Sequence, residues 1–396
     1  MSEHIGRPGL PLQGVTVLTV EHAVAAPFAT RQLADLGARV IKVERPGNGD
    51  FARDYDNSVN GSSSYFTWLN RSKESIELDL KSPAGQQVLS SLVQRSDVIV
   101  QNLGPGAAAR LGLAADDVRA ADPGKIVVGI TGWGSDGPWA TRKAYDLLVQ
   151  CETGLVSLTG SPDSAAKVGV SIADIAAGMY AFSGILAALY QRQVTGIGAS
   201  IEVPLFDALA EWVSQPAYFT AGAGRQPARS GSHHATIAPY GPYKTTEGRT
   251  VLLAVQNQPE WQLFCTGVLR DPDLSGDSRF HTNTGRVRHR EELDAIICAE
   301  LARLDLNELE RRLTAARIAF SSVKTVKEFL EHPVLAARNR WRIIDSETGP
   351  IPALLPPIDF GVPPRMGPVP ALGEHTDQIL AELGHHPLKS TAVVQG

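Results

Sequence analysis

Short apolar runs alternate with helical segments through the first third of this chain, and no other feature constrains the fold as strongly. Five runs rich in β-branched residues occupy residues 15–20, 38–44, 75–80, 97–102 and 125–131. Helical spacing of apolar residues appears between them, as in residues 27–37 and 82–96, and a further helix is expected through residues 108–121. Because helices connect parallel strands, this order predicts an α/β fold whose parallel sheet has helices on both faces.

The rest of the chain predicts a long buried helix, a smaller domain and a returning C-terminal segment. Residues 174–192 are apolar nearly all round, as in a helix buried on most sides. The Gly-, Ser- and His-rich run 222–241 is typical of a linker at a domain boundary, and it fits a lid equally well. We predict a large α/β domain in residues 1–221, a small α+β domain in 222–331 and a proline-rich strap in 332–396.

Composition excludes several classes of protein. The 396 residues have a net charge of −5, which gives no basic surface for a nucleic acid partner. The N-terminal residues contain no signal-peptide core, and we find no apolar run long enough to span a bilayer. We therefore expect a cytoplasmic protein without a membrane partner.

The cysteines predict neither a disulfide framework nor a metal site. Cys151, Cys265 and Cys298 are odd in number, far apart and without a CxxC pair. Each lies in an apolar neighbourhood, which predicts three buried, inert thiols.

Nucleotide-binding signatures are absent, since the sequence has neither a P-loop nor GxGxxG between a strand and a helix. Residues 102–106, NLGPG, follow a predicted strand and precede a helix. They are consistent with a plain turn or with backbone N–H groups that face a phosphate.

Asp174 stands at the start of the long apolar helix. An aspartate at this position normally serves as the N-cap. The same position favours the ionised carboxylate through the helix dipole, and an ionised carboxylate in an apolar setting can act as a nucleophile. The two interpretations are compatible.

Two other segments carry candidate site residues. Tyr145, Asp146 and Gln150 lie on an otherwise apolar segment, and the last two are one helical turn apart. They fit either a helix cap with a satisfied polar group or a supporting role in an active site. His233 and His234 are adjacent in a flexible run, where they fit surface positions or a site that binds an anion.

Five blocks of sequence, in this order, resemble the class III CoA-transferases, the family that includes formyl-CoA transferase and carnitine CoA-transferase. The blocks are residues 11–50, 65–85, 97–113, 171–189 and 372–380. The resemblance implies a Rossmann-like large domain built from both chain ends, a smaller domain between them, and a homodimer of two interlocked subunits.

The same resemblance implies an enzyme with acyl-CoA as substrate and without a metal or nucleotide cofactor. Asp174 falls at the family's catalytic aspartate, whose carboxylate attacks the thioester to give a mixed anhydride and then an aspartyl-CoA thioester. An incoming carboxylic acid reverses these steps and leaves with the CoA. Retention of such an aspartate speaks against a non-catalytic CoA-binding protein.

The resemblance also assigns CoA contacts, which are His22, Ala25, Arg45, Leu78, Lys81, Asn102, Leu103, Arg110 and Lys143. Val24 stands where formyl-CoA transferase has a glutamine, and the glycine-rich lid of that enzyme is missing, which disfavours formyl and oxalyl substrates. The sequence looks most like family members that use succinyl-CoA as donor and itaconate, mesaconate, citramalate or malate as acceptor. A second carboxylate on such an acceptor needs a cation, for which His233, His234 and Arg53 are the candidates.

A 2-methylacyl-CoA racemase is the alternative within the same superfamily. Racemases carry a histidine immediately before the aspartate matched by Asp146, whereas this chain has Tyr145. A tyrosine with an ordinary pKa near 10 is a poor proton shuttle at neutral pH, so the sequence disfavours racemisation.

Overall fold

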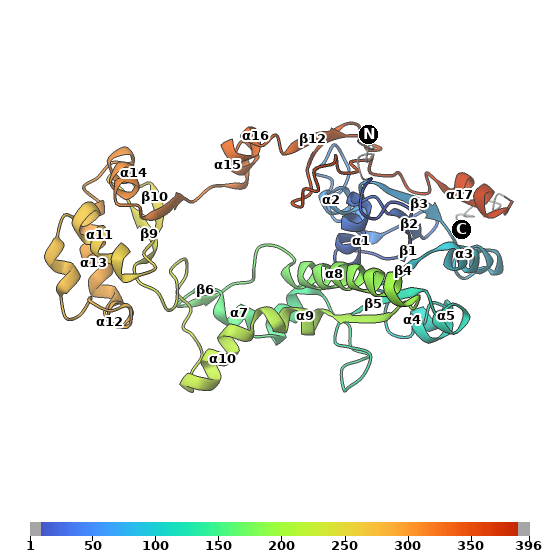
Figure 1. The fold of residues 1–396 in the computed structure, drawn as a ribbon, viewed down its shortest axis with the longest axis horizontal. Coiled ribbons are helices and arrows are strands. Elements are labelled where there is room, and N and C mark those ends of the chain that lie inside the picture. Colours follow the sequence, from blue (N-terminus) through green and yellow to red (C-terminus); the bar gives the residue numbers. More distant parts are fainter. Residues whose placement is uncertain (1–8, 387–396) are drawn as a thin grey trace, which may run out of the picture. The chain divides into compact units, whose positions relative to one another are not determined.

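The computed structural model describes residues 9–386, which form two compact units (Figure 1). The first unit contains the described parts of residues 1–153, 169–214 and 338–396. The second unit contains residues 154–168 and 215–337. Both ends of the chain therefore contribute to the first unit.

Six parallel strands form the sheet of the first unit, in the order β3-β2-β1-β4-β5-β8. They are β1 (Thr16–Val20), β2 (Arg39–Glu44), β3 (Lys73–Glu77), β4 (Val98–Gln101), β5 (Ile126–Thr131) and β8 (Ser200–Pro204). Val17 of β1 lies opposite Val40 of β2 and Val98 of β4. The predicted α/β fold with a parallel sheet is confirmed. The strand order changes direction between β1 and β4.

Helices cover both faces of this sheet (Figure 1). One side holds α1 (Ala25–Asp35) and α8 (Ile172–Thr195), and the other holds α3 (Pro83–Arg95), α5 (Ala115–Ala121) and α17 (Thr376–Leu383). Five neighbouring strands contribute side chains to a core shared with α3 and α17, among them Leu18, Ile41, Ile76, Ile99 and Val127. Burying such apolar side chains is the main source of the unit's stability.

The remaining helices of the first unit are short. They are the 3-10 helix η1 (Phe51–Asp54), α2 (Ser64–Asn70), α4 (Ala107–Arg110), α6 (Asp146–Glu152) and α9 (Leu205–Trp212). The single helix predicted through residues 108–121 is instead the pair α4 and α5. Gly112, at φ 68°, interrupts it, because a left-handed residue ends an α-helix.

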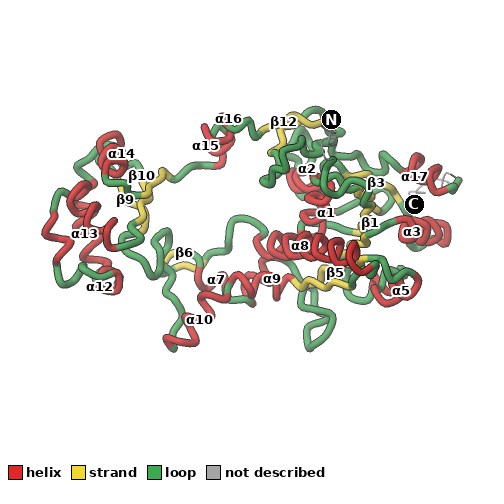
Figure 2. Tube along the Cα trace, viewed as in Figure 1, coloured by secondary structure: helices red, strands yellow, loops and turns green. Residues whose placement is uncertain are grey.

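The C-terminal segment returns along the edge of the sheet. It begins with a hairpin of β12 (Trp341–Ile344) and β13 (Ile351–Leu354), and residues 355–375 are mostly loop (Figure 2). The His375 N–H donates to the Ser75 carbonyl of β3 over 2.9 Å. The Glu77 N–H donates to Oγ1 of Thr376 over 3.0 Å. These bonds fix α17 beside β3.

The second unit combines a small antiparallel sheet with helices. The sheet has the order β11-β10-β9, formed by β9 (Tyr240–Lys244), β10 (Thr250–Ala254) and β11 (Ala319–Ser322). Its core contains Trp261, Phe264, Phe280 and Ile297, none of which is exposed. The helices are α10 (Ser214–Ala223), α11 (Gln258–Leu263), the π-helical η2 (Phe264–Leu269), η3 (Pro272–Gly276), α12 (Asn283–Arg288), α13 (Arg290–Leu301), α14 (Leu306–Ala315), α15 (Val326–Leu330) and α16 (Pro333–Ala337).

Residues 154–168 pack within the second unit, whereas the sequence analysis placed them in the large domain. They form α7 (Leu155–Leu158) and a hairpin of β6 (Gly160–Ser161) and β7 (Ser164–Ala165). Arg229 explains the difference, because its guanidinium donates to the carbonyls of Ser161 and Pro162 at 2.9 and 2.8 Å.

Two further expectations were wrong. Cys151 and Cys298 are exposed, and only Cys265 of the three cysteines is buried, because the first two lie on the outer sides of α6 and α13. In addition, α8 is long and apolar enough to span a membrane, with a mean hydropathy of 1.7 over its best window. In this unit, however, α8 packs against α1, α9 and the sheet, and such packing accounts for an apolar helix without any membrane.

Candidate active site

The change in strand order between β1 and β4 is where a parallel α/β sheet opens a crevice for ligands. The loops after these strands are tied together at this point. The His22 N–H donates to Oδ1 of Asn102 over 3.0 Å, and Nδ2 of Asn102 donates to the His22 carbonyl over 2.8 Å. The adjacent Leu103 packs against the sheet core. Candidate residues from separate sequence blocks therefore meet at the switch point.

The loop between β1 and α1 is short and sharply turned. Ala23 has φ 61°, in the left-handed region that L-residues other than glycine seldom adopt, and its N–H donates to Oδ1 of Asp50 over 3.1 Å. Val24 is the N-cap of α1, and Val24 and Ala25 are both buried. Among the described residues no side chain caps α1 with a hydrogen bond, so N–H groups of its first turn remain available to a ligand.

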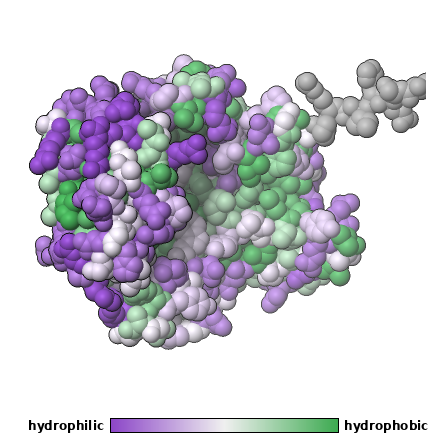
Figure 3. Space-filling model, turned by 60° about the vertical axis from the view of Figure 1, so that its left-hand side comes forward, coloured by the Kyte–Doolittle hydropathy of each residue, from purple (hydrophilic) through white to green (hydrophobic). Residues whose placement is uncertain are grey.

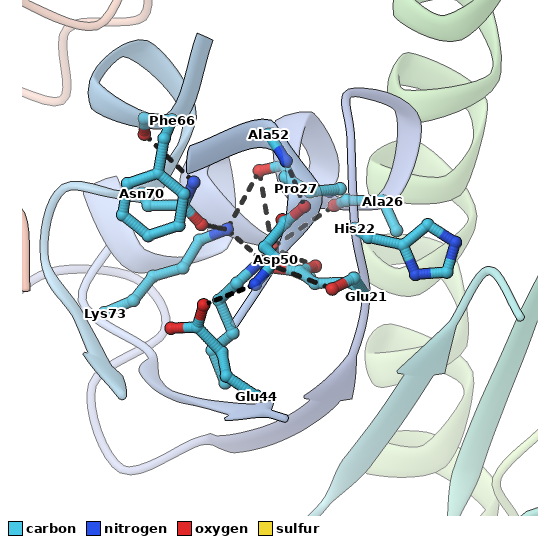
Figure 4. Close-up of polar contacts among 12 residues, drawn as sticks. Glu21, His22, Ala26, Pro27, Glu44, Asp50, Ala52, Phe66, Asn70 and Lys73 are labelled. Carbon is cyan, nitrogen blue, oxygen red and sulfur yellow. Dashed lines mark hydrogen bonds and ion pairs between the residues drawn. The ribbon is translucent and has the colours of Figure 1, made fainter. Parts of the chain in front are cut away.

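Buried charges lie beneath this loop (Figure 4). Nζ of Lys73 donates to Oε1 of Glu21 over 2.6 Å, and Nζ of Lys42 donates to Oδ2 of Asp50 over 2.8 Å. The Asp50 N–H donates to Oε2 of Glu44 over 3.0 Å. The His22 ring points away from these charges (Figure 4). Burial lowers the pKa of Lys73 to about 8, against the attraction of Glu21.

Asp174 lies in the first turn of α8 rather than at its N-cap. The helix begins at Ile172 with Ser171 as N-cap, which places Asp174 at the third helical position and corrects the N-cap prediction. Its side chain is partly buried. Within residues 9–386 its carboxylate accepts no hydrogen bond and forms no ion pair. The carboxylate is therefore free to react with a ligand.

The pKa of Asp174 is raised to about 7, first by burial and second by the nearby carboxylate of Asp146. From the sequence, the helix dipole is expected to keep this group ionised, but burial outweighs the dipole. Asp146 itself is held in place by two hydrogen bonds. Its Oδ1 accepts from the Ala173 N–H over 2.8 Å, and its Oδ2 accepts from Nε2 of the buried Gln150 over 2.7 Å. Tyr145 is 64% exposed and is the N-cap of α6.

Gly178 brings the start of α1 close to Asp174. It lies four residues after Asp174 and so on the same side of α8. A Cβ at Gly178 would lie 2.6 Å from the carbonyl oxygen of Ala25. Only a glycine permits this approach, and the start of α1 therefore contacts α8 one helical turn from Asp174.

Comparison with known proteins gives the family. The model of CoA-transferase family III matches residues 12–376. The chain belongs to CoA-transferase family III. It is 34% identical to the succinate–glutarate CoA-transferase of Agrobacterium fabrum, over 94% of this chain and 96% of that protein. It is 30% identical to the succinyl-CoA–D-citramalate CoA-transferase of Chloroflexus aurantiacus, over 95% of both chains.

A solved structure agrees in fold. A CAIB/BAIF family protein from Brucella suis superposes with a TM-score of 0.83 at 32% identity, and the match covers 95% of this chain and all of that one. The predicted family is thus confirmed, and the protein is a CoA-transferase.

In this family III enzyme, four exposed cations lie in the segments that follow successive strands of the sheet. Arg45 follows β2, Lys81 follows β3, Arg110 ends α4 after β4, and Lys143 lies in the loop after β5. Since all these strands are parallel, their carboxyl ends meet at one edge. Leu78, also a candidate contact, is fully buried beyond β3, where its N–H donates to the Glu44 carbonyl over 2.9 Å.

Arg53 of the transferase is already paired with another side chain. Its guanidinium forms two hydrogen bonds of 2.9 and 2.8 Å with the Glu44 carboxylate and lies 3.7 Å from the centre of the Phe66 ring. Burial alone would raise the pKa of Glu44, but Arg53 and Lys42 lower it to about 2. Arg53 thus neutralises Glu44 and is poorly suited to bind a substrate carboxylate.

His233 and His234 lie in the second unit of the transferase. The His233 ring stacks on Tyr243 with 6.1 Å between centroids, and the His234 ring stacks on Tyr240 at 5.2 Å. Burial lowers the pKa of His233 and so favours its neutral imidazole. That shift argues against the suggested role of His233 as a cation.

Sequence reasoning missed Tyr55. Burial first, and then the carboxylates of Asp50 and Asp174, raise the pKa of Tyr55 to about 12, which places its hydroxyl within electrostatic range of the catalytic candidate. Its ring contacts Phe51 and Tyr65, with centroids 5.7 and 5.3 Å away. The only sequence signal was a cluster of aromatic residues near the junction of the first two family-like blocks.

No group of three or more His, Cys, Asp or Glu side chains in the described part of the chain is arranged to hold a metal.

Proposed function

We propose that this enzyme moves CoA from succinyl-CoA to a dicarboxylic acid of four or five carbon atoms through covalent intermediates on Asp174. The observation that carries the proposal is the Asp174 carboxylate itself. It has no hydrogen-bonding partner among the described residues, and Asp174 lies one turn of α8 before Gly178, which contacts the uncapped start of α1. A pKa of about 7 leaves roughly half of this carboxylate ionised at neutral pH and keeps it more basic than an ordinary carboxylate.

The chemistry proceeds in two symmetrical halves. The ionised carboxylate of Asp174 attacks the thioester carbonyl, and the C–S bond breaks to give a mixed anhydride and the CoA thiolate. The thiolate then attacks the aspartyl carbonyl, releases the donor acid as its carboxylate, and leaves an aspartyl-CoA thioester. An acceptor carboxylate attacks that thioester and repeats both steps in reverse, which restores Asp174.

Each attack creates an oxyanion, and the first turn of α1 is suited to stabilise it. The N-terminus of a helix carries partial positive charge and free N–H donors. Ala25 begins this turn beside Gly178, on the side of α8 that carries Asp174. An oxyanion at that position would accept hydrogen bonds that the free protein leaves unmade.

Arg45, Lys81, Arg110 and Lys143 would bind the phosphates of CoA at the carboxyl edge of the sheet. All four are exposed, and each follows a different strand of the parallel sheet. Phosphate groups need such cations, and arginine can form two parallel hydrogen bonds with a phosphate. Asn102, which joins the β1 and β4 loops, would fix the floor of this crevice.

The relatives support the choice of substrate. Those from Agrobacterium fabrum and Chloroflexus aurantiacus are named for glutarate and D-citramalate, and a relative from Haloarcula hispanica is named for mesaconate. All three acids have five carbon atoms and two carboxylates. The proposed acceptor therefore includes glutarate beside the mesaconate, citramalate, itaconate and malate expected from the sequence.

The proposal extends to a homodimer in the cytoplasm. Large apolar side chains are exposed on the single chain, among them Tyr190 and Val194 on α8 and Val326 on α15, at 75%, 69% and 78%. Apolar patches interrupt the visible surface in Figure 3. Such patches commonly mark subunit interfaces. Light scattering that gives the mass of one chain at micromolar concentration would refute the dimer.

Trapping of the intermediate tests the proposed function. The purified protein is incubated with succinyl-CoA, reduced with borohydride, digested and analysed by peptide mass spectrometry. Modification confined to Asp174, and lost in Asp174→Ala, is the expected result, and a screen of the five acceptors follows. An unmodified Asp174 with a panel of acyl-CoAs, together with deuterium exchange at the α-carbon of a 2-methylacyl-CoA, would show a racemase instead.

A further inference from the structure

Asp50 connects the loop before α1 to the interior of the first unit. Its Oδ1 accepts from the N–H groups of Ala23 and Ala52 at 3.1 and 2.9 Å, and its Oδ2 accepts from Nζ of Lys42 at 2.8 Å. Asp50 is 3% exposed. One oxygen therefore holds the backbone of the loop, while the other is held by a buried cation.

This cation, Lys42, is part of a buried network of charged side chains. Lys42 also lies 3.5 Å from Oε1 of Glu21, the same oxygen that Lys73 binds at 2.6 Å. The side chains of Glu21, Lys42 and Lys73 are completely buried. A buried charge left without its partner is strongly destabilising, so each member fixes the position of the next.

This network holds the loop from both sides of its turn. Glu21 begins the loop and is a member of the network, and Ala23 is bonded to Asp50. Between them, His22 is bound by Asn102 from β4. Lys73 also donates to the carbonyl of Pro27 in the first turn of α1 over 3.2 Å. A left-handed turn at a non-glycine residue persists only where its surroundings enforce it, and these contacts do so.

We propose that Asp50 is a positioning residue for catalysis, which holds the left-handed turn at Ala23 and thereby the start of α1 against the Asp174 side of α8. Asp50 does not touch the reacting atoms. It acts by keeping the N–H groups of the α1 turn where the oxyanion forms. This inference rests on the proposed use of Asp174 as nucleophile.

A graded series of variants separates positioning from stability. Asp50→Ala removes both contacts, whereas Asp50→Asn keeps an oxygen for the Ala23 N–H and loses the pairing with Lys42. Asp50→Asn combined with Lys42→Met removes the unpaired cation as well. Asp35→Asn is the matched control, because Asp35 is an equally buried carboxylate that pairs with Arg31 and Arg71 at the opposite end of α1.

The readouts are single-turnover acylation of Asp174 by succinyl-CoA, the KM for succinyl-CoA, and hydrogen exchange of the loop amides. We expect acylation to slow about 10- to 100-fold in Asp50→Ala, with KM changed less than about threefold. Asp50→Asn with Lys42→Met should recover part of the rate. Asp35→Asn should unfold at lower temperature yet acylate at the wild-type rate, with the Ala23 amide still protected.

Folded Asp50→Ala with the wild-type acylation rate and an Ala23 amide as protected as in the wild type would overturn the inference. A folded double variant that acylates as slowly as Asp50→Ala, although its Ala23 amide is fully protected, would overturn it as well. If the wild type itself is not acylated, the proposed function fails, and hydrogen exchange still decides whether Asp50 orders the loop. Loss of loop protection in Asp50→Ala and not in Asp35→Asn supports the positioning role in either case.

Discussion

The backbone N–H of Ala173 donates to Oδ1 of Asp146 across 2.8 Å, and this bond couples α6 to the residue before Asp174. Gln150 binds the other oxygen of Asp146 over 2.7 Å. Asp146 therefore has a fixed position from which its charge acts on Asp174. Like charges at short range favour the protonated form of one partner, which is why Asp146 adds to the effect of burial on the pKa of Asp174.

Asp146→Asn should move the pH dependence of the enzyme. In the wild type we expect kcat/KM to rise with pH through about 7, because in the proposed mechanism only the ionised carboxylate of Asp174 attacks the thioester. Removing the charge of Asp146 lowers the pKa of Asp174, so the rise should shift to lower pH by roughly half a unit. Initial rates with succinyl-CoA between pH 5 and 9 measure the shift.

Asp377→Asn is the control for this experiment, since it removes an exposed carboxylate in α17, on the other face of the sheet. Its profile should coincide with that of the wild type. A profile of Asp146→Asn that also coincides with the wild type would show that Asp146 does not tune Asp174.

The sheet could be predicted from the sequence because strand and helix periods alternate clearly, but the chemistry beneath the first loop could not. Lys42 and Lys73 occupy strand positions that look solvent-facing, yet both are buried because helices cover both faces of a parallel sheet. No spacing rule pairs Lys42 with Asp50, or places Tyr55 near Asp174. These pairings exist only after the strands assemble.

The start of α8 could have been predicted from the sequence. Ser171 is followed three residues later by an acidic residue, a pattern that marks a helix N-terminus with the acid in the first turn. Applied to this segment, it would have placed Asp174 inside the helix, as the structure does. The raised pKa of Asp174 could not be predicted from the sequence, because it depends on burial and on Asp146 from another segment.

Asp174→Asn should abolish transfer and stabilise the fold at high pH. The native pKa of about 7 lies above the ordinary value of about 3.9, so the folded wild type loses stability relative to the unfolded chain as pH rises from about 4 through 7. Asparagine carries no charge to bury. The gain at pH 8 should be on the order of 1–3 kcal/mol, discounted for partial exposure, and should vanish near pH 4.

Calorimetry at pH 4.5 and pH 8 measures this difference. The melting temperature of Asp174→Asn should exceed that of the wild type by several degrees at pH 8 and by little at pH 4.5. Equal melting temperatures at both pH values would mean that the Asp174 carboxylate is not destabilised in the free enzyme.

Arg110→Ala should weaken the binding of CoA without slowing the chemistry. Arg110 is exposed at the end of α4 and makes no salt bridge within the described residues. Its loss should raise the KM for succinyl-CoA about 5- to 20-fold, change kcat little and leave the melting temperature unchanged. The KM of the wild type should also rise with salt, as expected when cations bind phosphates.

Arg303→Ala provides the comparison, because Arg303 is an exposed arginine of the second unit whose side chain is 76% accessible. It should leave KM unchanged at every salt concentration. An Arg110→Ala enzyme with wild-type KM would remove Arg110 from the CoA site.

Gly178→Ala should separate the start of α1 from Asp174. The new Cβ would lie 2.6 Å from the Ala25 carbonyl oxygen and 3.0 Å from Cδ1 of Phe28, and a backbone atom cannot yield as a flexible side chain can. Gly184→Ala on the same helix meets only Ile201 at 3.6 Å, an ordinary contact. That variant should be neutral or more stable by up to about 1 kcal/mol, because alanine favours helix.

The pair of glycines therefore distinguishes close approach from helix propensity. We expect Gly178→Ala to lower kcat about 100-fold at a temperature where circular dichroism shows it folded, while Gly184→Ala keeps the wild-type kcat. A displacement of about 1 Å at the α1 turn suffices for such a loss, because oxyanion stabilisation depends on donor geometry. If Gly178→Ala is folded and fully active, the contact between Gly178 and Ala25 does not position the α1 turn for catalysis.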